Sequence, residues 1–286
     1  MNTAQVVAAL RAAGCVFAED EAALLLAAPG SLDALVARRV AGEPLEQVLG
    51  WAEFDGLRIS VSPGVFVPRQ RSALLVRLGA RGLAAGAVAV DLCCGSGALA
   101  AALARRVPGV ELYACDVDDR AVTCARGNLP GAQVFAGDLW AALPTGLRGR
   151  VDVALANAPY VPSDSIALMP PEARDHEPRI SLDGGRDGLD VHRRIAMDAD
   201  DWLAPGGRLL IEVAPAQVPG ATVMFERAGL WPEVHTDDDL DATAVVATRA
   251  AAGRRSEGEA RHEDEGTPRA SGGAGRRARR SHRAAV

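Results

Sequence analysis

The segment Asn157-Ala158-Pro159-Tyr160 has the residue types from which an amide-binding site can be built. It directly follows the apolar run from Val151 to Ala156, a pattern that predicts a buried parallel strand. At the carboxyl end of such a strand, an asparagine side chain and a backbone restricted by proline make a rigid site for an amide group. We call this segment the clamp and expect it to hold the group on which the chemistry occurs.

A glycine-rich turn that precedes the clamp has the composition of a cofactor-binding loop. It reads Asp91-Leu92-Cys93-Cys94-Gly95-Ser96-Gly97 and follows an apolar strand pattern from Ala87 to Val90. The glycines let the backbone approach a ligand closely, and the N–H groups that start the next helix then face that ligand. Since both segments follow parallel strands of one sheet, the turn and the clamp should face each other.

Acidic residues follow the next two predicted strands. Asp116 ends the second strand, where its carboxylate is placed to accept hydrogen bonds from both hydroxyls of a ribose; its alternative role is a helix N-cap. Asp138 follows the third strand, placed to accept from the exocyclic amine of an adenine, with Leu139 on the ring face; their alternative role is turn chemistry. Together, the three strand ends predict a nucleoside cofactor.

S-adenosylmethionine is the cofactor that fits these features. The pattern Gly95-x-Gly97-x-x-Ala100 also passes the dinucleotide fingerprint, but a dehydrogenase needs a hydride-transfer acid or base where this chain has the clamp. The predicted catalytic residues are Asn157, Ala158, Pro159 and Tyr160. The predicted cofactor-binding residues are Asp91, Cys93, Gly95, Gly97, Asp116, Asp138, Leu139 and Asn157.

Composition and charge exclude several other classes of protein. The 31 basic residues are all arginine, so a Walker lysine, a Schiff-base lysine and a Tyr-x-x-x-Lys pair are excluded. Residues 1–249 carry a net charge of −10, which disfavours a large duplex-binding face and suits a cationic small molecule or a basic protein. No apolar run approaches the roughly 20 residues that span a bilayer, and no leader pattern is present, so we expect a cytoplasmic protein.

Five cysteines, at positions 15, 93, 94, 115 and 124, form no C-x-x-C pair and no Cys/His cluster with zinc-ligand spacing. We therefore expect no disulfide framework and no metal site. Cys93 and Cys94 lie in the cofactor loop, where simple packing is favoured over a reactive thiol.

The pattern of the chain predicts four parts. Residues 1–50 are expected to form a small helical domain, with helices at Ala4–Leu10, Glu19–Ala28 and Ser31–Val40, and residues 51–71 a β-hairpin linker. Residues 72–249 are expected to form the catalytic domain. Residues 250–286 are rich in arginine, glycine and serine, carry a net charge of +4 and are expected to be disordered, with contact to RNA as an alternative to a solvated extension.

Helical and strand patterns alternate through the catalytic domain, which predicts an α/β fold with a doubly wound, mostly parallel sheet. Beyond the strands named above, the segment Ala216–Ala228 predicts a helix, and Ala242–Thr248 an edge strand or a strand pair. The expected helices are 72–82, 97–106, 118–127 and 188–203, and the expected strands are 87–92, 110–115, 132–136, 151–156 and 207–213.

From about residue 30 to residue 249, the chain resembles the HemK-type protein-glutamine N5-methyltransferases, which have a Rossmann-like methyltransferase fold. Besides the cofactor loop and the clamp, the resemblance rests on six shorter motifs: Gly42-Glu43-Pro44-Leu45, Val48-Leu49-Gly50, Phe54-Asp55-Gly56-Leu57, Pro63-Gly64-Val65-Phe66-Val67-Pro68-Arg69, Glu177-Pro178-Arg179 and Gly184-Gly185-Arg186-Asp187-Gly188-Leu189-Asp190.

This resemblance implies methyl transfer from S-adenosylmethionine to the glutamine of the Gly-Gly-Gln motif in peptide-chain release factors, with residues 1–50 as the substrate-docking surface. It also implies that Asn157 and the Ala158 carbonyl hold the two amide hydrogens, that Tyr160 packs beside the substrate amide, and that Glu177 and Arg179 order the loop after the clamp.

The chain departs from the family pattern at three places. Ala158 replaces the first proline of the usual Asn-Pro-Pro-Tyr, Gln70-Arg71-Ser72 lacks the usual acidic residue, and Ala214-Pro215 lacks the usual glycine-aromatic continuation. Because Pro159 still restricts residue 158 to extended geometry, the clamp should survive. Two alternatives stay open: a nucleic-acid amino-methyltransferase, whose acceptor amine poses the same geometric problem, and a paralogue that binds without turnover.

Overall fold

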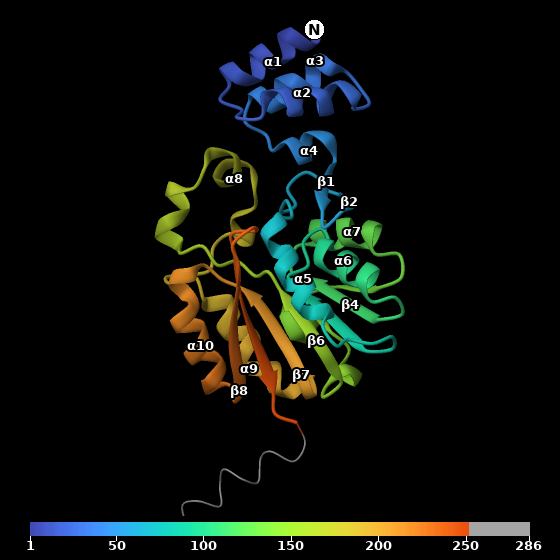
Figure 1. The fold of residues 1–286 in the computed structure, drawn as a ribbon, viewed down its shortest axis with the longest axis vertical. Coiled ribbons are helices and arrows are strands. Elements are labelled where there is room, and N and C mark those ends of the chain that lie inside the picture. The colour runs from blue at the N-terminus through green and yellow to red at the C-terminus, as the bar shows by residue number, and fades with distance from the viewer. Residues whose placement is uncertain (252–286) are drawn as a thin grey trace, which may run out of the picture. The chain divides into compact units, whose positions relative to one another are not determined.

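The structure of the protein, a computed structural model, describes residues 1–251. Its first part is helical, with α1 (Thr3–Ala12), α2 (Ala18–Ala27), α3 (Leu32–Val40) and the short α4 (Leu45–Leu49), as Figure 1 shows. The three predicted helices of this part are confirmed, and α4 was not predicted. The four helices share an apolar cluster that contains Val6, Leu10, Ala18, Ala22, Leu25, Val36 and Val48. The arginine-rich segment predicted for 250–286 lies outside the described residues from residue 252 onward.

A β-hairpin follows the helices, as the sequence predicts. Strands β1 (Trp51–Phe54) and β2 (Leu57–Ser60) pair antiparallel and form a two-stranded sheet of their own. The turn residues Asp55 and Gly56 have φ angles of 50° and 72°, the conformation that a two-residue Asp-Gly hairpin turn requires. The division of the chain into domains at residues 50 and 71 stays a prediction.

The main sheet has seven strands in the order β5-β4-β3-β6-β7-β9-β8 (Figure 1). The first five in this order run parallel, and β9 is antiparallel to both of its neighbours. The fold is therefore a mostly parallel, Rossmann-like α/β fold, as predicted. The strands are β3 (Val88–Leu92), β4 (Glu111–Asp116), β5 (Gln133–Ala136), β6 (Val151–Ala156), β7 (Leu203–Glu212), β8 (Leu230–Asp237) and β9 (Ala242–Arg249).

Helices cover both faces of this sheet. Successive side chains of a strand point to opposite faces, so each face carries apolar side chains that pack against helices. On β3, Ala89 belongs to the cluster of α5, α6 and α7, whereas Val88 and Val90 belong to the cluster of α9 and α10. The helices of the first face are α5 (Ala73–Ala80), α6 (Ala98–Arg106) and α7 (Asp119–Asn128), and those of the second are α9 (Asp190–Trp202) and α10 (Val218–Arg227). The carboxyl ends of the parallel strands are thereby left for ligands.

The sequence left two alternatives for one end of the sheet, an edge strand or a strand pair. Strand β9 matches the predicted strand Ala242–Thr248, but it lies inside the sheet, and β8 forms the edge beside it. Of the two alternatives, the strand pair is therefore present and the single edge strand is not. Strand β8 was not recognised because Pro232 and several charged residues interrupt its apolar pattern, a composition that edge strands tolerate.

None of the helices within residues 1–251 is long and apolar enough to cross a membrane.

Candidate functional site

Two neighbouring cavities lie where β3, β4, β5 and β6 end. The first, of about 240 Å³, is lined by the predicted cofactor residues Cys93, Gly95, Asp116, Asp138, Leu139 and Asn157, together with Pro159 of the clamp. The second, of about 370 Å³, is lined by Asn157, Ala158 and Tyr160 of the clamp and by Arg69 and Arg71, among others. Asn157 belongs to the wall of both cavities, so a group in one and a group in the other would meet at this side chain.

The glycine-rich loop shapes the first cavity through its backbone. Gly95 has a φ of +55°, with no atom within 4 Å of the place a Cβ would occupy, so its backbone is open to a ligand. Gly97 has a φ of +78° and begins α6; a Cβ there would lie 2.8 Å from the Leu129 side chain, so glycine is required for packing. Cys93 also has a positive φ, of 58°. The loop therefore presents backbone to the cavity.

Asp91 and Gly97 do not line the cavity but shape the loop that does. The carboxylate of Asp91 is buried and accepts a hydrogen bond from the backbone N–H of Ala100 over 3.1 Å, at the start of α6. Burial raises the pKa of Asp91 to about 7. Of the eight predicted cofactor-binding residues, these two would therefore shape the loop and would not contact the cofactor.

Asp116 has the geometry expected of a ribose-binding carboxylate. Its oxygens each accept one backbone hydrogen bond of 2.9 Å, from Gly95 and from Asp118. A carboxylate has about four acceptor positions, so each oxygen keeps one for a ligand hydroxyl. The N-cap role belongs to Asp118, whose side chain accepts from the backbone N–H of Arg120. Burial raises the pKa of Asp116, although hydrogen bonds from the backbone N–H groups of Asp118, Gly95 and Val117 oppose this.

Asp138 and Leu139 lie together at the far wall of the first cavity. The backbone of Leu139 has a φ of 51°, and its side chain is nearly buried against the cavity. The carboxylate of Asp138 forms an ion pair with Arg194 of α9, which lines the same cavity. The sequence did not single out Arg194, because an arginine on an amphipathic helix has the pattern of an ordinary solvated residue.

The first and last residues of the clamp, Asn157 and Tyr160, form hydrogen bonds with residues that lie far away in the chain. The side-chain nitrogen of Asn157 donates to the hydroxyl oxygen of Ser72 over 3.0 Å, which leaves the amide oxygen of Asn157 as the acceptor for a ligand. The hydroxyl of Tyr160 donates to Glu212 over 2.8 Å, and Arg71 donates to the same carboxylate oxygen over 3.0 Å. Burial and Glu212 raise the pKa of Tyr160, so its phenol stays neutral.

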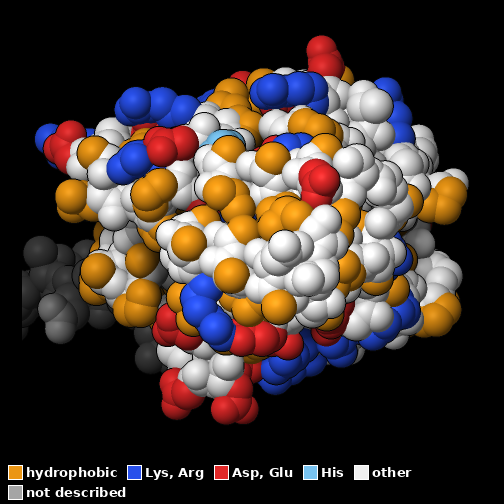
Figure 2. Space-filling model, turned by 90° about the horizontal axis from the view of Figure 1, so that it is seen from above, with side chains coloured by type: hydrophobic (Ala, Val, Ile, Leu, Met, Phe, Trp, Pro, Cys, Tyr) orange, Lys and Arg blue, Asp and Glu red, His pale blue; other side chains and the backbone are white. Residues whose placement is uncertain are grey.

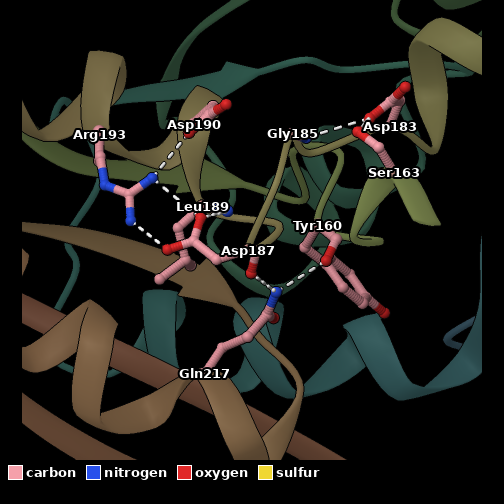
Figure 3. A network of polar contacts seen from close by, with 9 residues as sticks. All are labelled: Tyr160, Ser163, Asp183, Gly185, Asp187, Leu189, Asp190, Arg193 and Gln217. Atoms are coloured by element: carbon pink, nitrogen blue, oxygen red, sulfur yellow. Dashed lines mark hydrogen bonds and ion pairs between the residues drawn. The ribbon is translucent and has the colours of Figure 1, made fainter. Parts of the chain in front are cut away.

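The glycine motif at 184–188 packs directly against the backbone of the clamp. A Cβ on Gly184 would lie 2.7 Å from the Pro159 carbonyl oxygen, and a Cβ on Gly188 would lie 2.2 Å from that of Tyr160. The chain just after the clamp is also bonded to this turn. Asp183 accepts from the Ser163 hydroxyl over 2.6 Å and from the Gly185 N–H over 3.1 Å, as Figure 3 shows. The glycine motif therefore packs against the backbone of the clamp and restricts its position.

Glu177 and Arg179, in the loop after the clamp, both form contacts with other residues. The buried carboxylate of Glu177 accepts from the Val67 N–H over 3.2 Å and from Arg69 over 2.7 Å, and so ties this loop to the segment that precedes α5. Arg179 forms an ion pair with Asp183. Neither contact places these two residues on a reacting group.

The loop cysteines have the properties of packed, unreactive thiols. Burial raises the pKa of both Cys93 and Cys94 well above that of an ordinary thiol, so the nucleophilic thiolate is disfavoured.

The family model that matches the chain is the methyltransferase small domain, over residues 56–168. Among curated relatives, the release factor glutamine methyltransferase of Streptomyces coelicolor is 38% identical over 220 residues, which cover 75% of this chain and 78% of that protein. The enzyme of the same name from Geobacter sulfurreducens is 38% identical, covering 75% and 76%. A 4-amino-L-phenylalanine/4-methylamino-L-phenylalanine methyltransferase of Streptomyces pristinaespiralis is 34% identical, covering 78% and 82%.

Solved structures of methyltransferases share the fold. A 16S rRNA N2 G1207 methyltransferase of T. thermophilus, in complex with AdoMet and guanosine, is 22% identical with a TM-score of 0.51, covering 70% of this chain and 49% of that one. A methyltransferase of Pyrococcus furiosus is 17% identical with a TM-score of 0.52, covering 75% and 97%. At these identities the likeness concerns the fold alone.

Proposed function

Because the chain belongs to the release factor glutamine methyltransferase family, we propose that it transfers a methyl group from S-adenosylmethionine to the side-chain amide nitrogen of a release factor glutamine, that of the Gly-Gly-Gln motif. One observation carries this proposal. Asn157 stands in the wall shared by the two cavities, and its amide nitrogen is bound by Ser72, so its oxygen is available to an acceptor amide. A methyl donor on one side and an acceptor on the other would meet at this residue.

The first cavity offers hydrogen-bond acceptors of the kind that S-adenosylmethionine requires. Asp116 keeps acceptor positions for the ribose hydroxyls, and we assign Asp138 and Leu139, which line the same cavity, to the adenine amine and ring face. The open backbone at Gly95 faces the same space. When bound, S-adenosylmethionine supplies an electrophilic methyl group on a sulfonium.

The clamp addresses the weak nucleophilicity of an amide nitrogen. We assign the Asn157 side-chain oxygen and the Ala158 carbonyl as acceptors for the two amide hydrogens, which aims the nitrogen at the methyl group. These acceptors also stabilise the positive charge that develops on the nitrogen during transfer. Tyr160, held neutral, packs beside the acceptor. As the N–CH3 bond forms, the S–CH3 bond of the donor breaks and S-adenosylhomocysteine leaves. A strong general base is not required, because the proton passes from the methylated amide to water after transfer.

The helical part of the chain is the proposed docking surface for the release factor. It exposes large apolar side chains, with Val16 at 83% and Phe17 at 69% of their full exposure. Figure 2 looks onto this end and shows hydrophobic side chains spread over the face, with charged groups between and around them. Large exposed apolar side chains that are rimmed by polar residues are typical of protein interaction sites. Since release factors act on ribosomes, we also propose a cytoplasmic location.

A free amino acid with an aromatic amine is the second candidate acceptor. The relative named for 4-amino-L-phenylalanine motivates it, and so does the lining of the second cavity, which includes the apolar and aromatic side chains of Phe66, Met169 and Tyr160. A nucleic-acid amine is disfavoured by the net charge of −10 on residues 1–249, which repels phosphates.

One assay with three acceptors tests the proposed function. The full chain is incubated with radiolabelled S-adenosylmethionine and either unmethylated release factor, 4-amino-L-phenylalanine or a single-stranded oligonucleotide. We expect transfer to the release factor with the highest kcat/KM. Transfer to the free amino acid or the oligonucleotide alone would contradict the proposal and identify the acceptor class, and binding of S-adenosylmethionine with no transfer to any acceptor would indicate a non-catalytic paralogue.

A further inference from the structure

Gln217 is a buried residue between β7 and α10 whose side chain makes three hydrogen bonds to backbone groups. Its side-chain oxygen accepts from the Ala214 N–H over 2.9 Å. Its side-chain nitrogen donates to the carbonyl of Tyr160 over 2.8 Å and to the carbonyl of Asp187 over 3.0 Å, as Figure 3 shows. An amide nitrogen has two hydrogens, so both are used. The reverse orientation would place the amide oxygen against two carbonyl oxygens and is excluded.

The two carbonyls belong to two segments that pack against each other, the clamp and the glycine turn. Tyr160 is the last residue of the clamp, and Asp187 belongs to the glycine turn at 184–188. The turn is anchored independently, because the Asp187 carboxylate accepts from the Leu189 N–H over 3.2 Å and pairs with Arg193 of α9. Arg193 lowers the pKa of Asp187 to about 2. Gln217 thus joins Tyr160 to a turn whose position is already set.

The hydroxyl and the backbone carbonyl of Tyr160 are therefore both held, by the end of β7 and by the segment that follows it. Glu212, the last residue of β7, accepts from its hydroxyl, and Gln217 donates to its carbonyl. Gln217 is absent from the walls of both cavities, so it would touch neither cofactor nor acceptor. Gly188 lies where these groups meet. A Cβ on this residue would lie 2.2 Å from both the Gln217 side-chain nitrogen and the Tyr160 carbonyl oxygen, so only glycine fits there.

We propose that Gln217 is a positioning residue for methyl transfer. It fixes the backbone of Tyr160 and thereby the positions of the hydrogen-bond acceptors at Asn157 and Ala158. This inference rests on the proposed function of the clamp. A displacement of about 1 Å of a positioning group can cost roughly a hundredfold in rate, so a buried amide outside the cavities can govern turnover. Cofactor affinity does not depend on it.

The test replaces Gln217 by a group of the same shape that can donate one hydrogen bond at most, and only when it is protonated. In Gln217→Glu, an ionised carboxylate would face both carbonyls, whereas a protonated one would donate to one of them. Gln47→Glu is the control for a carboxylate buried against a carbonyl, because Gln47 is buried and its side-chain nitrogen donates to the Val65 carbonyl over 3.1 Å. Gln47 lies in the helical part proposed for docking, so we expect this variant to change KM for the release factor. We expect Gln217→Glu to lose about tenfold or more in kcat, with the affinity for S-adenosylmethionine unchanged.

Two further readouts separate positioning from general loss of structure. The kcat of Gln217→Glu relative to wild type should rise as the pH is lowered, whereas Gln47→Glu should show no such rise in kcat. Hydrogen exchange at the Val161 and Ser163 amides, which donate to Leu182 and Gly185, should become faster in Gln217→Glu only.

Hydrogen exchange needs no turnover, so it decides the inference even if the wild-type protein proves inactive on release factors, an outcome that would contradict the proposed function alone. The inference is overturned by unchanged exchange at both amides, by a kcat close to wild type in Gln217→Glu, or by a loss of cofactor affinity as large as the loss of turnover.

Discussion

The side-chain nitrogen of Asn157 donates a hydrogen bond to the hydroxyl oxygen of Ser72 over 3.0 Å, and so joins the end of β6 to the segment that opens α5. Ser72 is fully buried, and the hydrogen bond to its hydroxyl holds the Asn157 side chain with its amide oxygen free for a ligand. The orientation of the acceptor oxygen therefore depends on a residue outside the clamp.

Ser72→Ala should consequently lower turnover without affecting cofactor binding. Loss of one hydrogen bond of about 1 kcal/mol predicts a kcat about fivefold lower, because the Asn157 amide is then free to rotate. Steady-state kinetics and calorimetric titration with S-adenosylmethionine measure the two quantities. Ser72→Thr keeps the hydroxyl and should retain most of the activity; equal losses in the two variants would show that the hydroxyl is not the cause.

Asp116→Ala should weaken the binding of S-adenosylmethionine. Hydrogen bonds to a charged group contribute about 1.5–3 kcal/mol, so the dissociation constant should rise by about tenfold or more. Asp118→Ala is the control, since it removes the N-cap of α7 but keeps the backbone N–H that donates to Asp116. If calorimetry gave both variants the same affinity, the ribose-binding role of Asp116 would be refuted.

The glycine motif behind the clamp can be tested with two alanine substitutions of matched backbone geometry. Gly188 and Gly82 have φ angles of +78° and +70°, but a Cβ on Gly82 meets no atom within 4 Å. Gly82→Ala should cost about 1 kcal/mol from backbone strain alone, whereas Gly188→Ala should cost about 3 kcal/mol because it also clashes with Tyr160. Urea unfolding measures both values, and similar costs would contradict the packing described above.

His192 of α9 makes stability depend on pH in the acid range. Its imidazole is fully buried, and burial lowers its pKa to about 4. The unfolded chain binds a proton below about pH 6.5, but the folded chain does so only near pH 4, so the stability from neutral His192 is present above about pH 6.5 and is lost as the pH falls. At pH 5 the loss relative to pH 7.5 should be about 2 kcal/mol.

The measurement compares wild type with His192→Leu by urea unfolding at pH 5 and pH 7.5. The comparison is necessary because Asp91 acts in the opposite direction: its pKa is raised to about 7, so its contribution is lost as the pH rises through 7. The stability difference between the two proteins should shift by about 2 kcal/mol toward the variant at pH 5. A difference that is the same at both pH values would contradict a neutral, buried His192.

The sequence predicted the clamp, the loop and Asp116 because each follows a strand, and the carboxyl ends of parallel strands must meet. Ser72, Gln217 and Arg194 could not be found this way. Their contacts join segments far apart in the chain, and their local patterns are those of ordinary turn or surface residues. Strand β8 was missed for a related reason, because an edge strand can carry proline and charge where an interior strand cannot.

In the proposed mechanism, the clamp directs a methyl group onto one glutamine. The measurement is peptide mass spectrometry of unmethylated release factor after incubation with S-adenosylmethionine and either the wild-type protein or Asn157→Ala. We predict one added methyl group on the glutamine of the Gly-Gly-Gln motif with wild type and none with the variant, although the variant still binds cofactor. Methylation at another residue, or equal methylation by both proteins, would contradict it.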